Sequence, residues 1–306
     1  MENYTGFIEN SSSRSFLVTK DDKSLPESFI IINCVLNVPL MLICILGNVL
    51  VLAAIIRTPS ICSPSMTMLC SLAVSDLLVG FIAQPLFIAD ELIKENFVLY
   101  RVSAMIGFSV CGVSLATITL ISIDRFLAVQ YHMRYATLMH QSRVIFIIVI
   151  IWLFTFVCSG FHVWNKFLHH LLSAIYVAIC LIISTCCYIR IYLTVRHHRS
   201  QIRTQQQAVQ CRCADNNTSV MRLKRSAVNT FLFYICMIVC YFPAYVLLTI
   251  FGLGYLEWAT EWTITTTMVF MNSCINPILY CWRLRELRVA VVKTVKSVLR
   301  AKTDQD

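Results

Sequence analysis

The sequence predicts an all-α membrane protein, a seven-transmembrane helix bundle followed by a short amphipathic C-terminal helix. Hydrophobic residues make up 58% of the chain and charged residues 13%, against about 45–50% and about 25% in soluble domains. Residues 28–56 and residues 102–123 contain no Asp, Glu, Lys or Arg, and about 20 apolar residues are enough for a helix to cross a membrane. We therefore expect an extracellular N-terminal tail over 1–27, the bundle over 28–282, and a membrane-surface helix with a cytoplasmic tail over 283–306.

The distribution of charge along the chain predicts its orientation. The formal net charge is +9, and seven spans place 19 Lys and Arg with five acidic residues on one side, and six Lys and Arg with ten acidic residues on the other. Because basic segments stay in the cytoplasm, the N-terminus is expected outside the plasma membrane. Sequons at Asn3 and Asn10 are then expected to be glycosylated, whereas those at Asn216 and Asn217 are expected to remain unglycosylated. A nucleic-acid partner is not expected, because it would leave the apolar composition unexplained.

Apolar segments define the expected spans in order. They cover residues 28–56, 65–92, 100–131, 144–165, 167–189, 226–256 and 262–282. Pro85 is expected to kink the second span, and Pro243 to form a hinge in the sixth. The basic, Gln-rich segment 190–225 has no apolar stripe through its middle, so we expect a flexible cytoplasmic loop there.

The segment after the seventh span has the pattern of a helix that lies on a membrane. Its apolar residues recur at helical spacing, at Leu284, Leu287, Val291, Val295 and Val298, and basic residues occupy other faces. Such a helix is expected to rest on the anionic lipids of the inner leaflet.

Several polar residues interrupt the apolar spans. A carboxylate such as Asp76 costs roughly 2.5–3.5 kcal/mol in mid-membrane, so such groups usually face the bundle interior and serve a function. Ser114 lies at a depth in the third span that can meet Asp76. The third span ends in the adjacent charges of Asp124 and Arg125. Further polar side chains lie in the first and seventh spans, at Asn48, Asn272, Ser273 and Asn276.

Two motifs carry a family resemblance. Asp124-Arg125-Phe126 closes the third span and Asn276-Pro277-Ile278-Leu279-Tyr280 lies in the seventh. They resemble the Asp-Arg-Tyr and Asn-Pro-x-x-Tyr motifs of rhodopsin-like (class A) G-protein-coupled receptors. Gly47-Asn48-Val49, Leu72-Ala73-Val74-Ser75-Asp76 and Trp152 occur in the matching spans. The resemblance covers about residues 28–300, and it is strongest to the branch of melanocortin, cannabinoid, lysophospholipid and adenosine receptors.

The resemblance implies a receptor and not an enzyme. It implies that an extracellular ligand shifts the sixth helix outward, that Arg125 then meets a heterotrimeric G protein, and that Met133 contacts the G protein from the second inner loop. Arrestin is a further expected partner. The residues expected to rearrange with Asp124 and Arg125 are Tyr188, Tyr241, Pro243, Asn276, Pro277 and Tyr280.

The resemblance also implies a sodium ion at the buried carboxylate, and no other cofactor. The expected ligands are Asp76, Ser114, Asn272 and Asn276, supported by Asn48 and Ser273. Carboxylate, hydroxyl and amide oxygens suit such a hard cation.

The sequence departs from the family pattern at several positions. Tyr100 stands where most relatives carry a Cys, so the usual disulfide to the second outer loop is expected to be absent. Cys180 replaces the usual Pro of the fifth span, and Tyr241 replaces the usual Trp of the sixth. Leu223 replaces an acidic partner of the motif Arg in many relatives, which leaves open a constitutively active or ligand-independent receptor. A small transporter or channel is the other alternative, although no internal repeat supports it.

The expected ligand is a peptide or a lipid. Amine receptors carry an Asp where this chain has Gly107, and adenosine receptors carry an Asn where it has Leu248. Candidate pocket residues lie at the outer mouth and in the sixth span: Asp90, Glu91, His162, Tyr241 and Tyr245.

Overall fold

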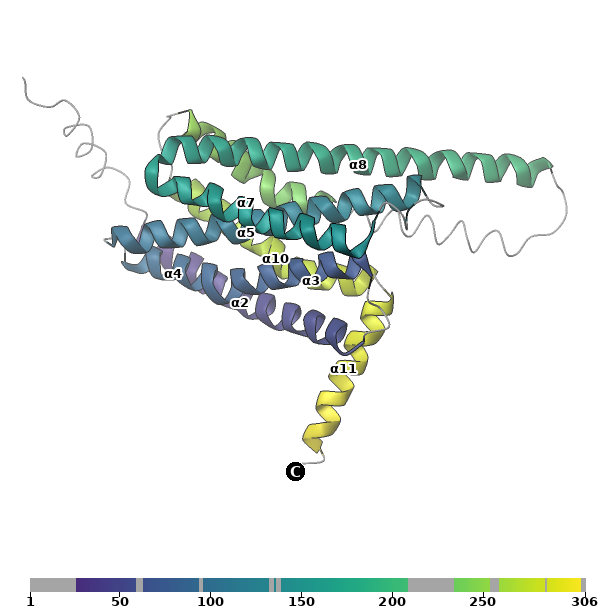
Figure 1. Cartoon of the computed structure of the whole chain (residues 1–306). Helices are drawn as coiled ribbons and strands as arrows, with labels where there is room; N and C mark the ends of the chain where they lie inside the picture. The colour runs from purple at the N-terminus through teal and green to yellow at the C-terminus, as the bar shows by residue number, and fades with distance from the viewer. Residues whose placement is uncertain are drawn as a thin grey trace, which may run out of the picture.

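The computed structural model describes residues 26–58, 63–93, 96–131, 135, 139–208, 234–253, 259–283 and 285–303, and Figure 1 shows that they form a helix bundle. In chain order the elements are α2 (Glu27–Ile56), α3 (Pro64–Leu78), the π-helical turn η2 (Val79–Ala83), α4 (Gln84–Ile93), α5 (Phe97–Gln130), α7 (Gln141–Trp164), α8 (Lys166–Ala208), α10 (Ala259–Arg283) and α11 (Arg285–Thr303). A helix over Tyr234–Gly252, called the sixth span below, lies between α8 and α10 in the sequence.

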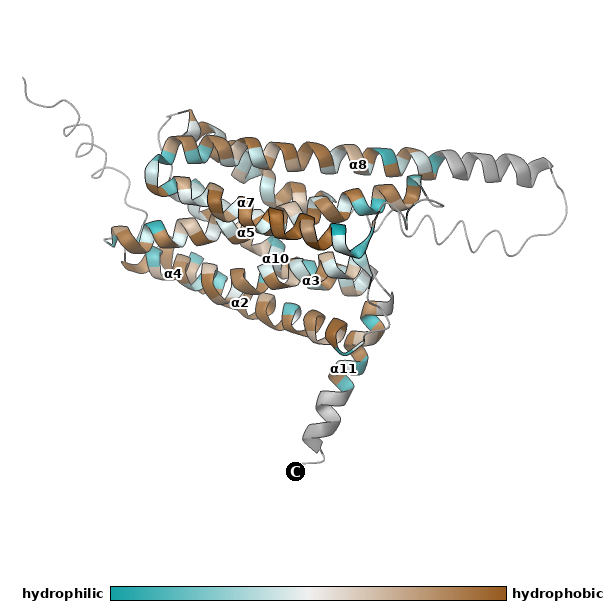
Figure 2. Cartoon of the chain, in the orientation of Figure 1, coloured by the Kyte–Doolittle hydropathy of each residue, from teal (hydrophilic) through white to brown (hydrophobic). Residues whose placement is uncertain are grey.

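Six helices of the described chain are long and apolar enough to cross a membrane. They are Glu27–Ile56, Pro64–Ile93, Phe97–Gln130, Gln141–Trp164, Lys166–Arg196 and Tyr234–Gly252, and in Figure 2 most of their residues have hydrophobic colours. The seventh, α10, has 25 residues and a larger share of polar side chains than these six. Because Thr263, Asn272 and Asn276 are buried, α10 turns its polar face into the bundle, and the seven-helix prediction is confirmed.

The third span is the centre of the packing. α5 contacts α3, α4, α7 and α8, and in Figure 1 it lies between α8 at one edge and α2 at the other. α2 contacts α3, α4, α10 and α11. α4 carries Asp90 near its C-terminal end, α5 begins four residues after α4 ends, and Arg125 lies near the C-terminal end of α5. We therefore call the two ends of the bundle the Asp90 end and the Arg125 end.

The bundle has the inverted polarity of a membrane protein. Large apolar side chains such as Phe146 and Ile182 are more than half exposed, whereas Asp76 and Asn48 are completely buried. Lipid can solvate apolar side chains but cannot satisfy polar ones, so the polar groups must find partners inside the bundle.

A π-helical turn interrupts the second span. The backbone N–H of Gln84 bonds to the carbonyl of Val79, five residues earlier. Pro85 lacks an N–H, and its ring would collide with the carbonyl four residues earlier in a regular helix. The wider turn relieves this collision, so the irregularity expected at Pro85 takes the form of a π-helical turn just before it.

Two segments near the Arg125 end differ from expectation. The predicted loop is wrong for residues 190–208, because α8 continues to Ala208 and extends beyond the bundle in Figure 1. Arg and Gln are good helix formers, and this segment is rich in both. Residues 209–225 lie outside the described part. α11 is present as predicted, but its buried side chains are Leu287, Ala290 and Thr294, because the helix packs against α2.

One glycine allows a close helix contact that can be tested. A Cβ atom at Gly252 would lie 2.7 Å from the backbone nitrogen of Leu171 on α8, whereas a Cβ atom at Gly160 would meet nothing within 4 Å. We expect Gly252→Ala to lower the thermal unfolding temperature by several degrees, since overpacking costs about 1–3 kcal/mol. Gly160→Ala is the matched control, and thermal unfolding of the purified protein, followed with a thiol-reactive dye, measures both. Equal unfolding temperatures for the two variants would contradict the close contact.

Candidate functional site

A hydrogen-bonded carboxylate lies in the middle of the bundle. Asp76 of α3 is completely buried. Ser114 of α5 donates to its Oδ1 at 3.0 Å, and the Asn276 amide of α10 donates to its Oδ2 at 2.9 Å. The Ser75 and Ser114 hydroxyls are also within 2.9 Å of each other. One carboxylate therefore joins three helices, and two of its partners are residues that the sequence placed with it.

The first helix closes the other side of this carboxylate. Asn48 donates to the carbonyls of Cys44 and Ser273 at 2.9 and 3.3 Å, and the Cys44 thiol donates to the carbonyl of Asp76 at 3.1 Å. A Cβ atom at Gly47 would lie 2.9 Å from the Pro277 ring. Gly47 therefore lets α2 approach α10 closely, where α10 carries the Asn-Pro motif.

The donor set around Asp76 consists of oxygen atoms and amides. The Asn48 Oδ1 and Asn272 Nδ2 atoms are buried and have no hydrogen-bond partner among the described residues. No group of three His, Cys, Asp or Glu side chains in the described chain is placed to hold a metal ion. An ion at Asp76 would therefore depend on one carboxylate with hydroxyl and amide oxygens, a set that suits a hard monovalent cation better than a transition metal.

The adjacent charges lie at the Arg125 end. Asp124 is completely buried and its carboxylate lies 3.5 Å from the Arg125 Nε. Two further groups hold the carboxylate: the Ser65 hydroxyl donates at 2.8 Å and the Tyr135 phenol at 2.6 Å. Burial raises the pKa of the Tyr135 phenol, and its bond to Asp124 raises it further, so the phenol keeps the proton that it donates.

Tyrosines of the fifth and sixth spans meet close to this charge pair. Ser122 of α5 donates to the Tyr188 hydroxyl at 3.0 Å, and the rings of Tyr188 and Tyr234 lie 5.0 Å apart. Tyr280 is buried within the main core. Met133 lies outside the described residues. The structure thus places Tyr188 against α5 and the sixth span, where a helix movement would disturb it.

A cavity of about 1090 Å³ opens toward the Asp90 end. Of the predicted pocket residues, Asp90, Glu91 and Tyr241 line it, whereas His162 and Tyr245 do not. His162 lies behind the wall, with its ring 5.0 Å from that of His169. At the opposite end of the cavity from its mouth, the Tyr241 hydroxyl donates to the Cys111 carbonyl of α5 at 3.3 Å.

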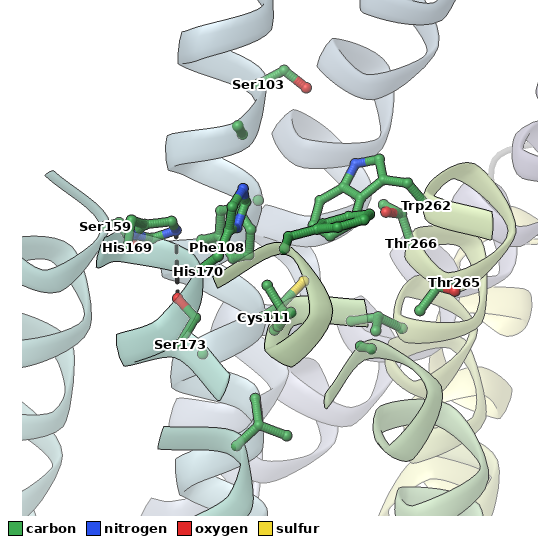
Figure 3. Close-up of a pocket in the computed structure, with 18 of the residues that line it drawn as sticks. Ser103, Phe108, Cys111, Ser159, His169, His170, Ser173, Trp262, Thr265 and Thr266 are labelled. Carbon is green, nitrogen blue, oxygen red and sulfur yellow. Dashed lines mark hydrogen bonds between the residues drawn. The ribbon is translucent and has the colours of Figure 1, made fainter. Parts of the chain in front are cut away.

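The residues that dominate the cavity wall were not predicted from the sequence. Phe108 of α5 packs on His169 and Trp262, with ring centroids 4.4 and 5.8 Å away. In Figure 3 His169 and Ser159 stand on one wall, and Trp262, Thr265 and Thr266 stand on the other. The only sequence signal was the His169-His170 pair at the start of α8, because a pair of polar residues is unusual in an apolar span.

A second polar layer, also not predicted, joins the first and seventh spans. The Thr267 hydroxyl donates to Asn33 Oδ1, and the Asn37 amide donates to the Thr267 hydroxyl, both at 3.0 Å. Gln84 directly follows η2 and is completely buried. Its side-chain amide has no hydrogen-bond partner among the described residues. Buried amides in this situation usually bind water.

These features together define a seven-helix membrane protein with a cavity at one end and a buried charge pair at the other. The chain matches the family model "7 transmembrane receptor (rhodopsin family)" over residues 47–164 and 160–280. Melanocortin receptor 4 of Danio rerio is 26% identical over 278 residues, which cover 84% of this chain and 80% of the relative. Adenosine receptor A2b of Gallus gallus is 24% identical over 313 residues, which cover 88% and 89%. The chain therefore belongs to the rhodopsin family of seven-transmembrane receptors.

The similarity is spread over nearly the whole chain. Melanocortin receptor 3 of Homo sapiens is 26% identical over 299 residues, which cover 92% of this chain and 88% of the relative. Similarity to both melanocortin and adenosine receptors agrees with the branch predicted from the motifs. The protein is thus a multi-pass membrane protein of the G-protein-coupled receptor class.

Proposed function

We propose that this receptor binds an extracellular peptide or lipid in the cavity and passes the signal to a heterotrimeric G protein at the Arg125 end. The observation that carries the proposal is the position of Asp76. Its bonds to Ser114 and Asn276 link α3, α5 and α10 between the cavity and the Asp124–Arg125 pair. A ligand that favours a different arrangement of these helices would shift the population of the receptor at both ends.

The sixth span supplies the moving part of this mechanism. Pro243 lies two residues after Tyr241, and a proline within a helix removes one backbone bond and permits bending. The Tyr241 bond to Cys111 holds the sixth span to α5 at the cavity. A ligand that displaces this contact would release the sixth span, and Tyr188 and Tyr280 would then rearrange around Arg125. Arrestin would bind the same end after the G protein.

The experiment that tests this function measures coupling directly. The receptor is expressed with a panel of G-protein dissociation sensors and screened against peptide and lipid libraries, with nucleosides as a third set because one relative is an adenosine receptor. We expect at least one peptide or lipid to activate a sensor, and Arg125→Ala to abolish the response at equal surface expression. A response that survives Arg125→Ala would contradict the proposed coupling end.

We further propose that Asp76, Ser114, Asn272 and Asn276 hold a sodium ion in the inactive state, with Asn48 and Ser273 in support. The buried Asn48 Oδ1 atom, which has no protein partner among the described residues, supports this because it is an oxygen that an ion or its bound water could use. The ion would hold α3, α5 and α10 in the inactive arrangement through their oxygen atoms.

Sodium dependence is the first prediction of this function. We expect sodium to lower agonist affinity and basal G-protein signalling relative to potassium at equal ionic strength, because it stabilises the inactive arrangement. Asp76→Asn removes the negative charge and should abolish the difference between the two salts. Basal signalling in each salt, normalised to surface expression, measures the effect. If the Asn variant keeps the full sodium effect, the ion binds elsewhere.

Orientation is the second prediction. We propose that the N-terminus is extracellular and that the receptor resides in the plasma membrane, so Asn3 and Asn10, which lie outside the described residues, should carry glycans. Glycosidase treatment should increase the mobility of the wild type on gels and leave the double variant Asn3→Gln, Asn10→Gln unchanged. Asn217→Gln is the control and should behave as the wild type. A glycan that depends on Asn217 would reverse the orientation.

The restraint on Arg125 gives the third prediction. Tyr135→Phe removes the 2.6 Å bond to Asp124 and leaves the ring in place. Asp124 is then held less firmly beside Arg125, and losing about 1.4 kcal/mol of inactive-state bias raises the active-to-inactive ratio tenfold. We expect higher basal G-protein signalling, measured without ligand at equal surface expression. Tyr131→Phe, at an exposed tyrosine of the same segment, is the control, and equal basal signals from the two variants would contradict the role of Tyr135.

A further inference from the structure

The cavity reaches the lipid-facing surface of the bundle. Phe154 of α7 and Leu172, Ile175 and Ile179 of α8 line the cavity and are also among the exposed apolar side chains, at 53%, 38%, 49% and 51%. In a membrane bundle such side chains contact the hydrocarbon core. The cavity therefore opens between α7 and α8 into the bilayer, and we call this part, lined by Phe154, Leu172, Ile175 and Ile179, the α8 arm.

The α8 arm and the wall that leads to it from Lys166 together form a long part of the cavity. Lys166 and Ile179 both line the cavity and lie 13 residues apart on α8, which is about 20 Å along a helix. Between them the wall is mainly apolar or aromatic, with the Tyr176 hydroxyl already bonded to the Gly112 carbonyl at 2.9 Å. An extended apolar chain fits the wall at Leu172, Ile175 and Ile179, where the lining side chains are apolar and the nearby Tyr176 hydroxyl is already bonded.

Toward the Asp90 end, the cavity wall beside the α8 arm carries a lysine and a buried imidazole. Lys166 lines the cavity with its Nζ 5.3 Å from the centre of the Tyr100 ring. His170 also lines it, is 3% exposed, and its Nδ1 has no hydrogen-bond partner among the described residues. A lysine and an imidazole nitrogen that needs a partner form a site for an anionic oxygen group.

One carboxylate of the cavity, Glu91, is held by the seventh span. Glu91 of α4 accepts a 2.8 Å bond from Thr263 of α10, and α10 forms the wall opposite His169 in Figure 3. The Phe108 ring of α5 contacts both walls, with its centroid 4.4 Å from that of His169 and 5.8 Å from that of Trp262. Lys166 and Glu91 are thus held by different helices, α8 and α4.

We infer that the α8 arm binds an anionic single-chain amphiphile that enters from the bilayer, with its carboxylate or phosphate group at Lys166 and His170 and its chain along Ile175 and Ile179. The inference rests on the proposed receptor function and deepens it, because it names the chemistry of the ligand. A peptide ligand would instead enter from the aqueous end near Asp90 and would not need the opening to lipid.

The test measures binding separately from signalling. Full-length receptor in phosphatidylcholine nanodiscs is titrated with oleate and with oleoyl lysophosphatidate, which separate a carboxylate from a phosphate headgroup, and with oleylamine and oleyl alcohol as cationic and neutral controls. A ligand that binds only the folded state raises the thermal unfolding temperature. We expect one or both anions to raise it by several degrees, and the two controls to have little effect.

Variants of Lys166 and His170 locate the headgroup. Lys166→Gln should weaken the anion's apparent affinity about tenfold, and His170→Gln should weaken it as well, since each removes a contact to a charged group. Arg101→Gln is the matched control, because Arg101 lies over the Phe97 ring at 4.1 Å and does not line the cavity. His170→Gln also guards against a Lys166 variant that fails to fold.

The outcomes separate the ligand site from the receptor function. Equal stabilisation by all four amphiphiles, or equal loss in the Arg101 and Lys166 variants, would overturn the inference. Stabilisation that depends on Lys166 without any G-protein response would support the site and contradict the proposed signalling. Activation by a ligand that is insensitive to Lys166→Gln, with no binding of either anion, would overturn the site and leave the receptor function intact.

Discussion

The burial of one carboxylate governs the arrangement of the bundle. Asp76 lies in the interior of an apolar membrane protein, where water is not available to solvate it and an unpaired charge is very costly. Ser114 and Asn276 supply donors to both of its oxygens, so α3, α5 and α10 must keep a common register at this depth. The close approach of Gly47 to Pro277 then follows, because α2 has to come near α10 for Asn48 to reach the Ser273 carbonyl.

The sequence could predict the features that depend on one helix at a time. Apolar length identified the spans, and depth along two helices was enough to pair Ser114 with Asp76. Features that depend on the rotation of one helix against another could not be predicted. Thr267 bonds to Asn33 and Asn37 only because α2 and α10 are rotated so that these side chains face each other. The rotation of α7 against α8 likewise places His162 behind His169 and not in the cavity wall. The extension of α8 to Ala208 was not predicted, because residues 190–208 are polar and lack an apolar stripe. Helix propensity does not require such a stripe.

Aromatic packing takes the position of the disulfide that most relatives carry at the start of the third span. The Tyr100 ring lies 5.9 Å from the His162 ring and 5.3 Å from the Lys166 Nζ, so it connects α5 to the end of α7 and the start of α8. α7 and α8 are separated by Asn165 alone, so the connection between them is too short to form a loop that would have to be anchored to α5. The cysteines of the described chain lie largely within the spans, where they pack as small apolar residues.

The hydrogen bonds along the path from the cavity to the Arg125 end differ in strength, and this difference decides the order in which they would break. The Tyr241 bond to Cys111 is 3.3 Å long and joins neutral groups, whereas the bonds to Asp76 and Asp124 are 2.6–3.0 Å long and involve a carboxylate. Bonds to ionised groups are about twice as strong as neutral ones. Tyr241 lines the cavity, so a ligand bound there would be able to replace the Tyr241 contact directly. The carboxylate bonds involve residues that do not line the cavity. Those bonds must change through the movement of the helices that carry them, which is why a signal from the cavity requires the rearrangement of whole helices and not of single side chains.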